Sequence, residues 1–181
     1  MNKLILLSLL CLIAFGCSKS SNSYSFKTLE FSFSNTFETS FSIKLIPGDS
    51  LYIREHWSAN DIYDSIKSPR SKTNYVSKLS TEQLKTLNNL VSKLKLKKYR
   101  DEYFEDYADG SGYSFLIDKD SIKKQINVHS HKEVPKELDS LAMWLYKLKS
   151  GLALKEINKK LNFKTAKFVN PPPPPPPGKK Y

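Results

Sequence analysis

Apolar and polar residues alternate with a period of two through residues 26–56. The segment LEFSF (29–33) alternates Leu and Phe with Glu and Ser, and the segment FSIKL (41–45) repeats this pattern. A turn sequence, PGD (47–49), leads into residues 50–56, where Leu and Ile occupy alternate positions. Alternation of this kind is typical of strands that bury one face. The pattern predicts a meander of three antiparallel strands.

Two later segments have the spacing of amphipathic helices. Ser80 and Gln83 form a capping-box signature before the first segment, and apolar residues follow at positions 84, 87, 91 and 94. Pro135 suits the first turn of the second helix and Gly151 suits its C-terminal cap. Apolar residues lie between them at positions 138, 141, 142, 145 and 148. We therefore expect one helix after Ser80 and another after Pro135.

The region between the two helices predicts a hairpin. Residues 113–117 and 122–128 lie on either side of the turn sequence DKDS. The element order is then β-β-β-α-β-β-α, which predicts an α+β fold: an antiparallel sheet of about five strands with two helices packed on one face. Residues 57–77 are polar and predict a surface loop that leaves room for a short strand near Tyr75.

The N-terminus has the features of an export signal. An apolar run of 12 residues follows Lys3; it is shorter than the roughly 20 residues that a membrane-spanning helix needs, and it is typical of a secretory signal peptide. The sequence AFGC (14–17) resembles the lipobox of bacterial prolipoproteins, which implies cleavage before Cys17 and attachment of a lipid to Cys17. Ala14 and Phe15 depart from the residues that this family favours. The same residues also match the cleavage site of ordinary signal peptidase, and cleavage by that enzyme would release a soluble protein.

The cysteine count favours lipidation. Cys11 leaves with the signal, so Cys17 is the only thiol of the mature chain and no intramolecular disulfide can form. Lipidation would account for a lone exported thiol, which is otherwise unusual. The polar residues after Cys17 suit a flexible tether, and the resemblance implies outer-membrane delivery because Ser18 follows the cysteine. We therefore expect an exported protein attached to the bilayer through Cys17.

Charge is concentrated near the C-terminus. The chain has a net charge of +11, and residues 151–181 hold seven lysines and one acid. A basic segment beside a lipid anchor could bind anionic headgroups or another envelope polymer, or it could be a solvated surface.

The seven consecutive prolines at 171–177 predict a polyproline II segment, which could be a ligand, a spacer or a tail without a role. No base-reading motif is present, so we do not expect nucleic acid as a partner.

These features divide the chain into five parts. The third part, the domain, resembles uncharacterised small lipoprotein domains, and this resemblance assigns no role to any residue. The parts are a signal peptide (1–16), a lipidated tether (17–25), an α+β domain (26–150), a basic C-terminal extension (151–170) and a polyproline tail (171–181).

Three histidines are weak candidates for a metal site. His129 and His131 end the predicted hairpin, and residues two apart in a strand point to the same face. His56 ends an earlier strand and could supply a third ligand. No HExxH motif accompanies them, and exposed histidines in a loop are the competing interpretation. We expect no cofactor.

The acidic segment 101–109 does not form an EF-hand. The calcium loop would need an oxygen ligand at position 107 and Glu at 116, where the chain has Tyr107 and Leu116. No GxSxG nucleophile motif is present either. We therefore expect a non-catalytic binding or structural module of the bacterial envelope, whose partners are the lipid bilayer and an envelope protein or anionic polymer. The alternative is an envelope hydrolase or metal-binding protein that uses His129 or His131 with a nearby carboxylate.

Overall fold

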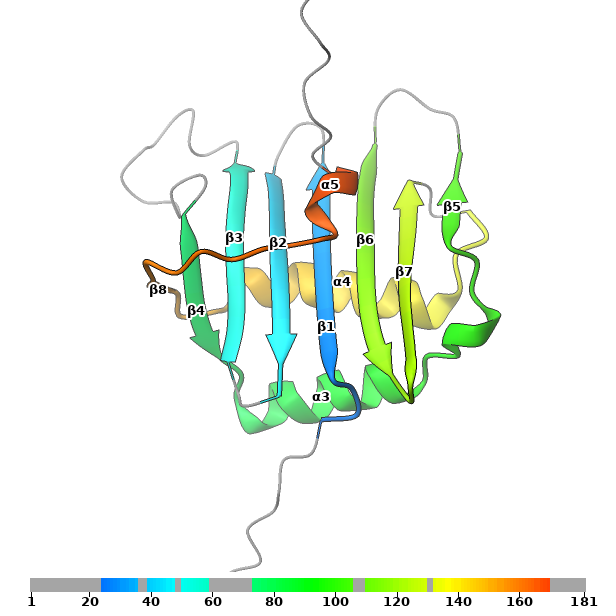
Figure 1. Ribbon diagram of the computed structural model, residues 1–181, viewed down its shortest axis with the longest axis horizontal. Helices are drawn as coiled ribbons and strands as arrows, with labels where there is room; N and C mark the ends of the chain where they lie inside the picture. Colours follow the sequence, from blue (N-terminus) through cyan, green and yellow to red (C-terminus); the bar gives the residue numbers. More distant parts are fainter. Residues whose placement is uncertain are drawn as a thin grey trace, which may run out of the picture.

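The domain is built around one eight-stranded sheet (Figure 1). The computed structural model describes residues 24–35, 39–47, 50–58, 73–105, 110–129 and 132–169. The strands are β1 (Thr28–Asn35), β2 (Thr39–Ile46), β3 (Ser50–Ser58), β4 (Asn74–Lys78), β5 (Glu102–Phe104), β6 (Ser111–Lys119), β7 (Ile122–His129) and β8 (Lys155–Glu156). The helical elements are α3 (Thr81–Ser92), the 3-10 turn η1 (Leu96–Lys98), α4 (Lys136–Ser150) and the short α5 (Ala166–Val169).

The strand order is β5-β7-β6-β1-β2-β3-β4-β8. All neighbouring strands are antiparallel except β5 and β7, which are parallel. The first strand therefore lies inside the sheet, between β2 and β6. The predicted α+β fold with a mostly antiparallel sheet and two main helices is confirmed. The sheet has eight strands rather than five. The short strand β4 lies near Tyr75, where the sequence left room for one. β5 and β8 contain only three and two residues and are too short to show an alternating pattern.

Both main helices begin where the sequence indicates. The capping box before α3 is formed: the Gln83 amide donates to Ser80 Oγ over 3.2 Å and the Ser80 amide donates to Gln83 Oε1 over 2.8 Å. Helix α4 starts directly after Pro135, and the Gly151 amide caps it by donating to the carbonyl of Leu148 over 3.0 Å.

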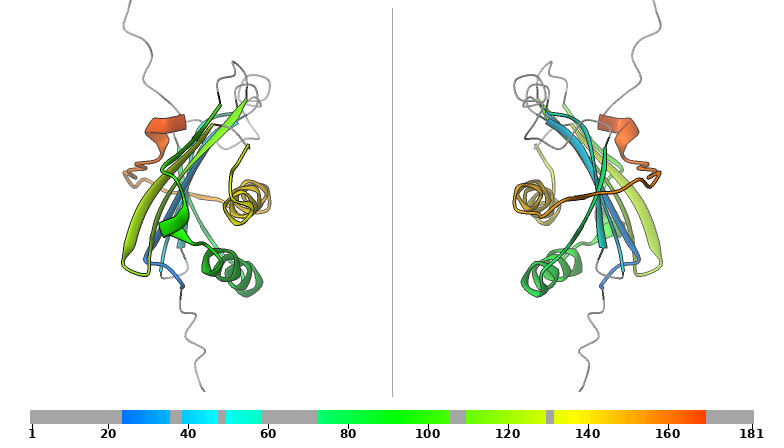
Figure 2. Two further views of the ribbon diagram at one scale, coloured as in Figure 1. Left: turned by 90° about the vertical axis from the view of Figure 1, so that its right-hand side faces the viewer. Right: turned by 90° about the vertical axis from the view of Figure 1, so that its left-hand side faces the viewer.

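The main core lies between the sheet and these two helices, which cover the same face (Figure 2). Leu29, Phe31 and Phe33 on β1 belong to this core, and Phe31 is fully buried. Its ring lies 4.9 Å from that of Phe115 and 6.0 Å from that of Phe41, measured between centroids. Burial of each large apolar side chain contributes about 1.5–3 kcal/mol, so this face supplies much of the stability of the fold.

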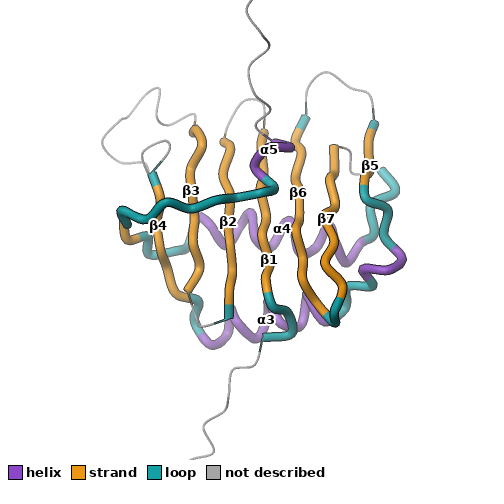
Figure 3. The backbone as a smooth tube through the Cα atoms, in the orientation of Figure 1, coloured by secondary structure: helices purple, strands orange, loops and turns teal. Residues whose placement is uncertain are grey.

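A segment after α4 crosses the other face of the sheet. We call residues 157–169 the strap; Figure 3 shows it running from β8 across β3 and β2 to α5. The Ile157 amide donates to the carbonyl of Asn74 over 2.9 Å, and Asn74 Nδ2 donates to the carbonyl of Lys159 over 2.7 Å. Most of the segment predicted as a basic extension is therefore packed on the sheet.

The described chain enters and leaves the sheet at opposite ends. Near its start, the Ser25 amide donates to Asn88 in α3, and the Lys27 amide donates to the carbonyl of Asp118 at the end of β6. We call this end the tether pole; in Figure 1 it lies at the bottom. Helix α5 lies at the other end, where Phe168 approaches Gly112 near the start of β6.

Candidate functional site

A chain of hydrogen bonds fills the space between the sheet and the strap. Thr165 donates from its amide (2.8 Å) and its hydroxyl (3.0 Å) to Glu30 Oε1. The Thr165 hydroxyl also lies 2.7 Å from the hydroxyl of Ser32, which in turn is hydrogen-bonded to Ser42. All four side chains come from residues with no exposed surface. Alternation along β1 and β2 places these polar residues on the strap face and the Phe residues between them in the core.

The carboxylate of Glu30 carries the one charge in this chain of bonds. Lys44 Nζ lies 3.1 Å from Glu30 Oε2 and also donates to the carbonyl of Asn162 in the strap over 3.1 Å. A buried carboxylate needs a partner of opposite charge and hydrogen bonds to its oxygens. Lys44 and Thr165 supply both, so the strap helps to satisfy a charge that the sheet alone would leave exposed.

The network ends at a histidine on β3. His56 Nε2 lies 2.8 Å from Ser42 Oγ. Burial, and to a smaller extent the positive charge of Arg54, lowers the pKa of His56 to about 4. The imidazole is therefore neutral at pH 7 and can accept the hydrogen bond of Ser42.

Sequence reasoning did not predict this serine–histidine pair. A histidine hydrogen-bonded to a serine is the arrangement that activates a nucleophile. Ser42, however, has no exposed surface and is also bonded to Ser32, so a substrate cannot reach its hydroxyl while the strap is in place. The pair belongs to the buried network. The sequence signal was the row of small serines beside the Phe residues of β1 and β2, because small polar side chains leave room for a covering segment.

The structure does not bring the candidate metal ligands together. His56 lies on β3 and His129 on β7, with β2, β1 and β6 between them. Four steps of about 4.8 Å separate the two strands by about 19 Å. Two histidine nitrogens on one zinc ion each lie about 2.1 Å from the metal and therefore within about 4 Å of each other. The described residues contain no group of three or more His, Cys, Asp and Glu that could hold a metal ion. His131 and Cys17 lie outside the described residues.

His129 lies at the corner formed by β5 and β7. It is opposite Phe104 in the parallel register, and the two rings stack with centroids 5.3 Å apart. The Phe104 residue is 63% exposed. The acidic segment begins here: Asp101 forms an ion pair with Lys124 at 2.8 Å, and Glu105 forms one with Lys132 at 3.4 Å. Residues 106–109 lie outside the described residues.

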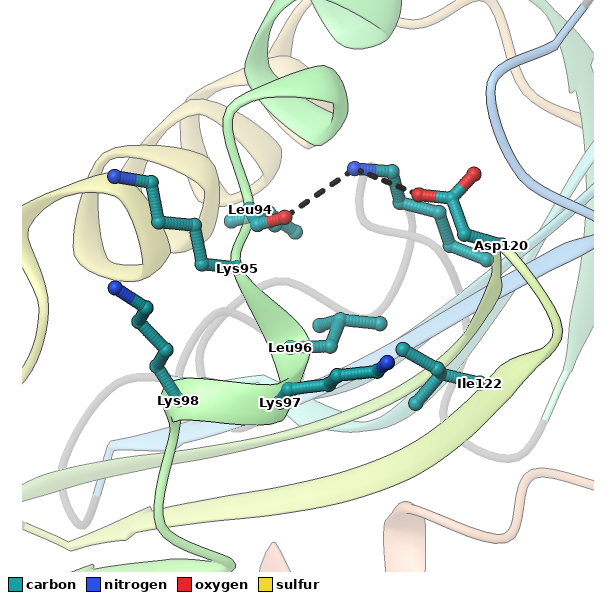
Figure 4. Close-up of a pocket in the computed structure, with 8 residues that line it drawn as sticks. Leu94, Lys95, Leu96, Lys97, Lys98, Asp120 and Ile122 are labelled. Carbon is teal, nitrogen blue, oxygen red and sulfur yellow. Dashed lines mark hydrogen bonds and ion pairs between the residues drawn. The ribbon is translucent and has the colours of Figure 1, made fainter.

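A lysine-lined pocket of about 340 Å³ lies near the tether pole (Figure 4). It opens between the link from α3 to η1 and the turn from β6 to β7, and its lining residues are Leu94, Lys95, Leu96, Lys97, Lys98, Lys119, Asp120 and Ile122. Sequence reasoning did not single out these lysines. The pocket forms because the chain returns to this point in β6, and no local pattern indicates that return.

Comparison with known proteins finds one family. Residues 58–149 match the model described as a domain of unknown function (DUF6438). No curated protein and no solved structure matches the chain. Among the described residues, no helix is both long and apolar enough to cross a membrane.

The family match covers β4, α3, β5, β6, β7 and most of α4, but it starts at the last residue of β3. In the sheet, β1, β2 and β3 separate β4 from β6. The matched residues therefore need the three preceding strands to form one continuous sheet. The match covers just over half of the 181 residues of the chain. The chain therefore belongs to the DUF6438 family.

Proposed function

We propose that this protein is an exported lipoprotein of the bacterial envelope whose domain is a binding module rather than an enzyme. The observation that carries the proposal is the lipobox-like AFGC sequence, whose Cys17 lies only seven positions before Tyr24, the first described residue. Seven residues span at most about 25 Å when fully extended. A lipid on Cys17 would hold the tether pole close to the bilayer.

The arrangement of reactive side chains supports binding over catalysis. In the serine–histidine pair of Ser42 and His56, the Ser42 hydroxyl has no exposed surface and is part of the buried hydrogen-bond network. Asp101 and Glu105 in the acidic segment form ion pairs with lysines. The alternative, a hydrolase or metal-binding protein that uses His129 or His131, stays a prediction, because His131 and residues 106–109 lie outside the described residues.

The intact mass of the mature protein isolated from membranes tests whether Cys17 is lipidated and anchors the protein. The expected result is a chain that begins at Cys17, carries a diacylglyceryl group and fractionates with membranes. Cys17→Ala should abolish both the added mass and the membrane fractionation. Cys11→Ala is the matched control and should change neither, because Cys11 leaves with the signal peptide. An unmodified chain that begins at Cys17 in the soluble fraction would overturn the proposal.

A further inference from the structure

The lysine-lined pocket lies beside the point where the tether joins the domain. The amide of Lys27 donates to the carbonyl of Asp118, one residue before Lys119 in the pocket wall. The Ser25 amide donates to Asn88 Oδ1 in α3, four residues before that helix ends at Ser92 and the chain enters the link that lines the pocket. A tether at Cys17 therefore brings this pocket, rather than the strap, close to the bilayer.

One of the four pocket lysines is used by the fold. Lys119 Nζ donates to the carbonyls of Ser92 (3.1 Å) and Leu94 (3.2 Å), and it lies 3.5 Å from the carboxylate of Asp120. The two carbonyls lie at the C-terminal end of α3, where the helix dipole repels anions. Lys119 offsets this negative end, so the helix does not oppose the binding of an anion in the pocket.

The other three lysines are available to a ligand. Lys95, Lys97 and Lys98 are exposed, and none of them forms an ion pair with a residue that the structure describes. In Figure 4, Lys95 and Lys98 extend to one side of the link and Lys97 extends toward Ile122. Ammonium groups bind phosphate as point charges, and the Leu and Ile side chains of the lining offer apolar contact to the carbon part of the ligand.

We propose that this pocket binds the phosphate headgroups of anionic lipids in the bilayer that holds the tether. The choice of a membrane over a soluble phosphate rests on the lipid anchor at Cys17 proposed above. Each lysine near an anionic surface contributes substantially to binding, and loss of three should weaken it by on the order of 100-fold. Because the lysines are exposed, the binding should also weaken as the salt concentration rises.

The test uses the mature chain, residues 17–181, with Cys17→Ala so that no lipid contributes. Its binding is titrated with phosphatidylcholine vesicles, with and without phosphatidylglycerol. The pocket variant carries Lys95→Gln, Lys97→Gln and Lys98→Gln. The matched control carries Lys160→Gln, Lys164→Gln and Lys167→Gln, which removes the same charge from exposed positions on the strap and α5. A third variant with Lys→Arg at the three pocket positions keeps the charge, and circular dichroism checks that each variant folds.

The expected result is binding that requires phosphatidylglycerol, is lost in the pocket variant, and is kept in the control and in the Lys→Arg variant. Equal losses in the pocket and control variants would show a general charge effect and overturn the proposal. Binding of inorganic phosphate at the pocket without binding to vesicles would also overturn it. Vesicle binding here does not depend on modification of Cys17, so failure of the pocket and failure of the anchor are separate results.

Discussion

The two faces of the central sheet are both buried, but they are stabilised in different ways. On β1, Leu29 and Phe31 face a core of apolar side chains under α3 and α4, and Glu30 and Ser32 face a polar network under the strap. All four residues have no exposed surface. A strand with an alternating sequence can thus be fully buried if apolar side chains cover its apolar face and hydrogen-bonding groups cover its polar face.

This difference determines what each face of the sheet contributes to the free energy of folding. The apolar face gains free energy in proportion to the area removed from water. A hydrogen bond of the polar face contributes only about 1 kcal/mol net, but a buried group left without its partner costs about 1–3 kcal/mol. The helix face therefore provides stability, and the strap face fixes where the strap lies.

The largest expected effect is on the helix face. Phe31→Ala removes a fully buried ring that packs against Phe41 and Phe115, and we expect the free energy of unfolding to fall by about 3–5 kcal/mol. Urea denaturation followed by circular dichroism measures it. Phe104→Ala removes the same side chain from an exposed position and should cost about 0.5 kcal/mol or less. Similar losses in both variants would contradict the division of roles between the core and the surface.

The next effect is on the strap face and should be local. Glu30→Ala removes the acceptor of both Thr165 bonds and the ion-pair partner of Lys44. We expect a loss of about 2 kcal/mol, smaller than for a fully buried pair because Lys44 can still reach water. Amide hydrogen exchange should accelerate in residues 162–168 and stay slow in α3 and α4.

Glu102→Ala is the control for this change, because it removes a carboxylate from an exposed position. Its exchange pattern should match that of the wild-type protein. If Glu30→Ala left the exchange of the strap unchanged, the carboxylate would not be what holds the strap.

A third effect, of similar size, depends on pH. The pKa of His56 is about 4 in the folded protein and about 6.5 in the unfolded chain. Below pH 6.5 the unfolded chain binds a proton that the folded protein does not bind until pH 4. The free energy of unfolding should therefore fall as the pH drops from 6.5 to 4, by on the order of 2 kcal/mol from this residue after allowance for its partial exposure.

His56→Gln keeps a hydrogen-bonding side chain near Ser42 but cannot take up the proton. Urea denaturation at pH 7 and at pH 4.5 should show a smaller decrease in this variant than in the wild-type protein. Equal decreases would mean that the His56 ring is solvated in the folded state and contributes nothing to the pH dependence.

Local patterns were enough to predict much of the fold. The alternating Phe and Ser residues near Phe31 indicate β1 and β2, and the capping box at Ser80 marks the start of α3. The strap was missed because its sequence is rich in Lys and has no periodic pattern, and only Phe163 and Thr165 are buried in it. Its position depends mostly on backbone carbonyls and on partners in distant strands, such as Glu30.

The candidate sites were less predictable than the elements. The strand order decides that His56 and His129 lie far apart, because β1 and β2 are inserted between β3 and β6. Strand order depends on packing between segments distant in sequence, which periodicity does not report. The pocket near Lys97 needed the same long-range information, since its two walls come from different parts of the chain.

The internal position of β1 also governs the order in which the molecule can assemble. Asn35 lies opposite Ser111, so the pairing of β1 with β6 closes a loop of at least 76 residues. Closing such a loop costs entropy before its contacts form, and chains dominated by distant pairings fold slowly. The strap binds side chains of β1, β2 and β4 and packs against β6. Its complete docking surface does not exist until that loop has closed, so the segment that covers the polar face is the last part that can reach its final place.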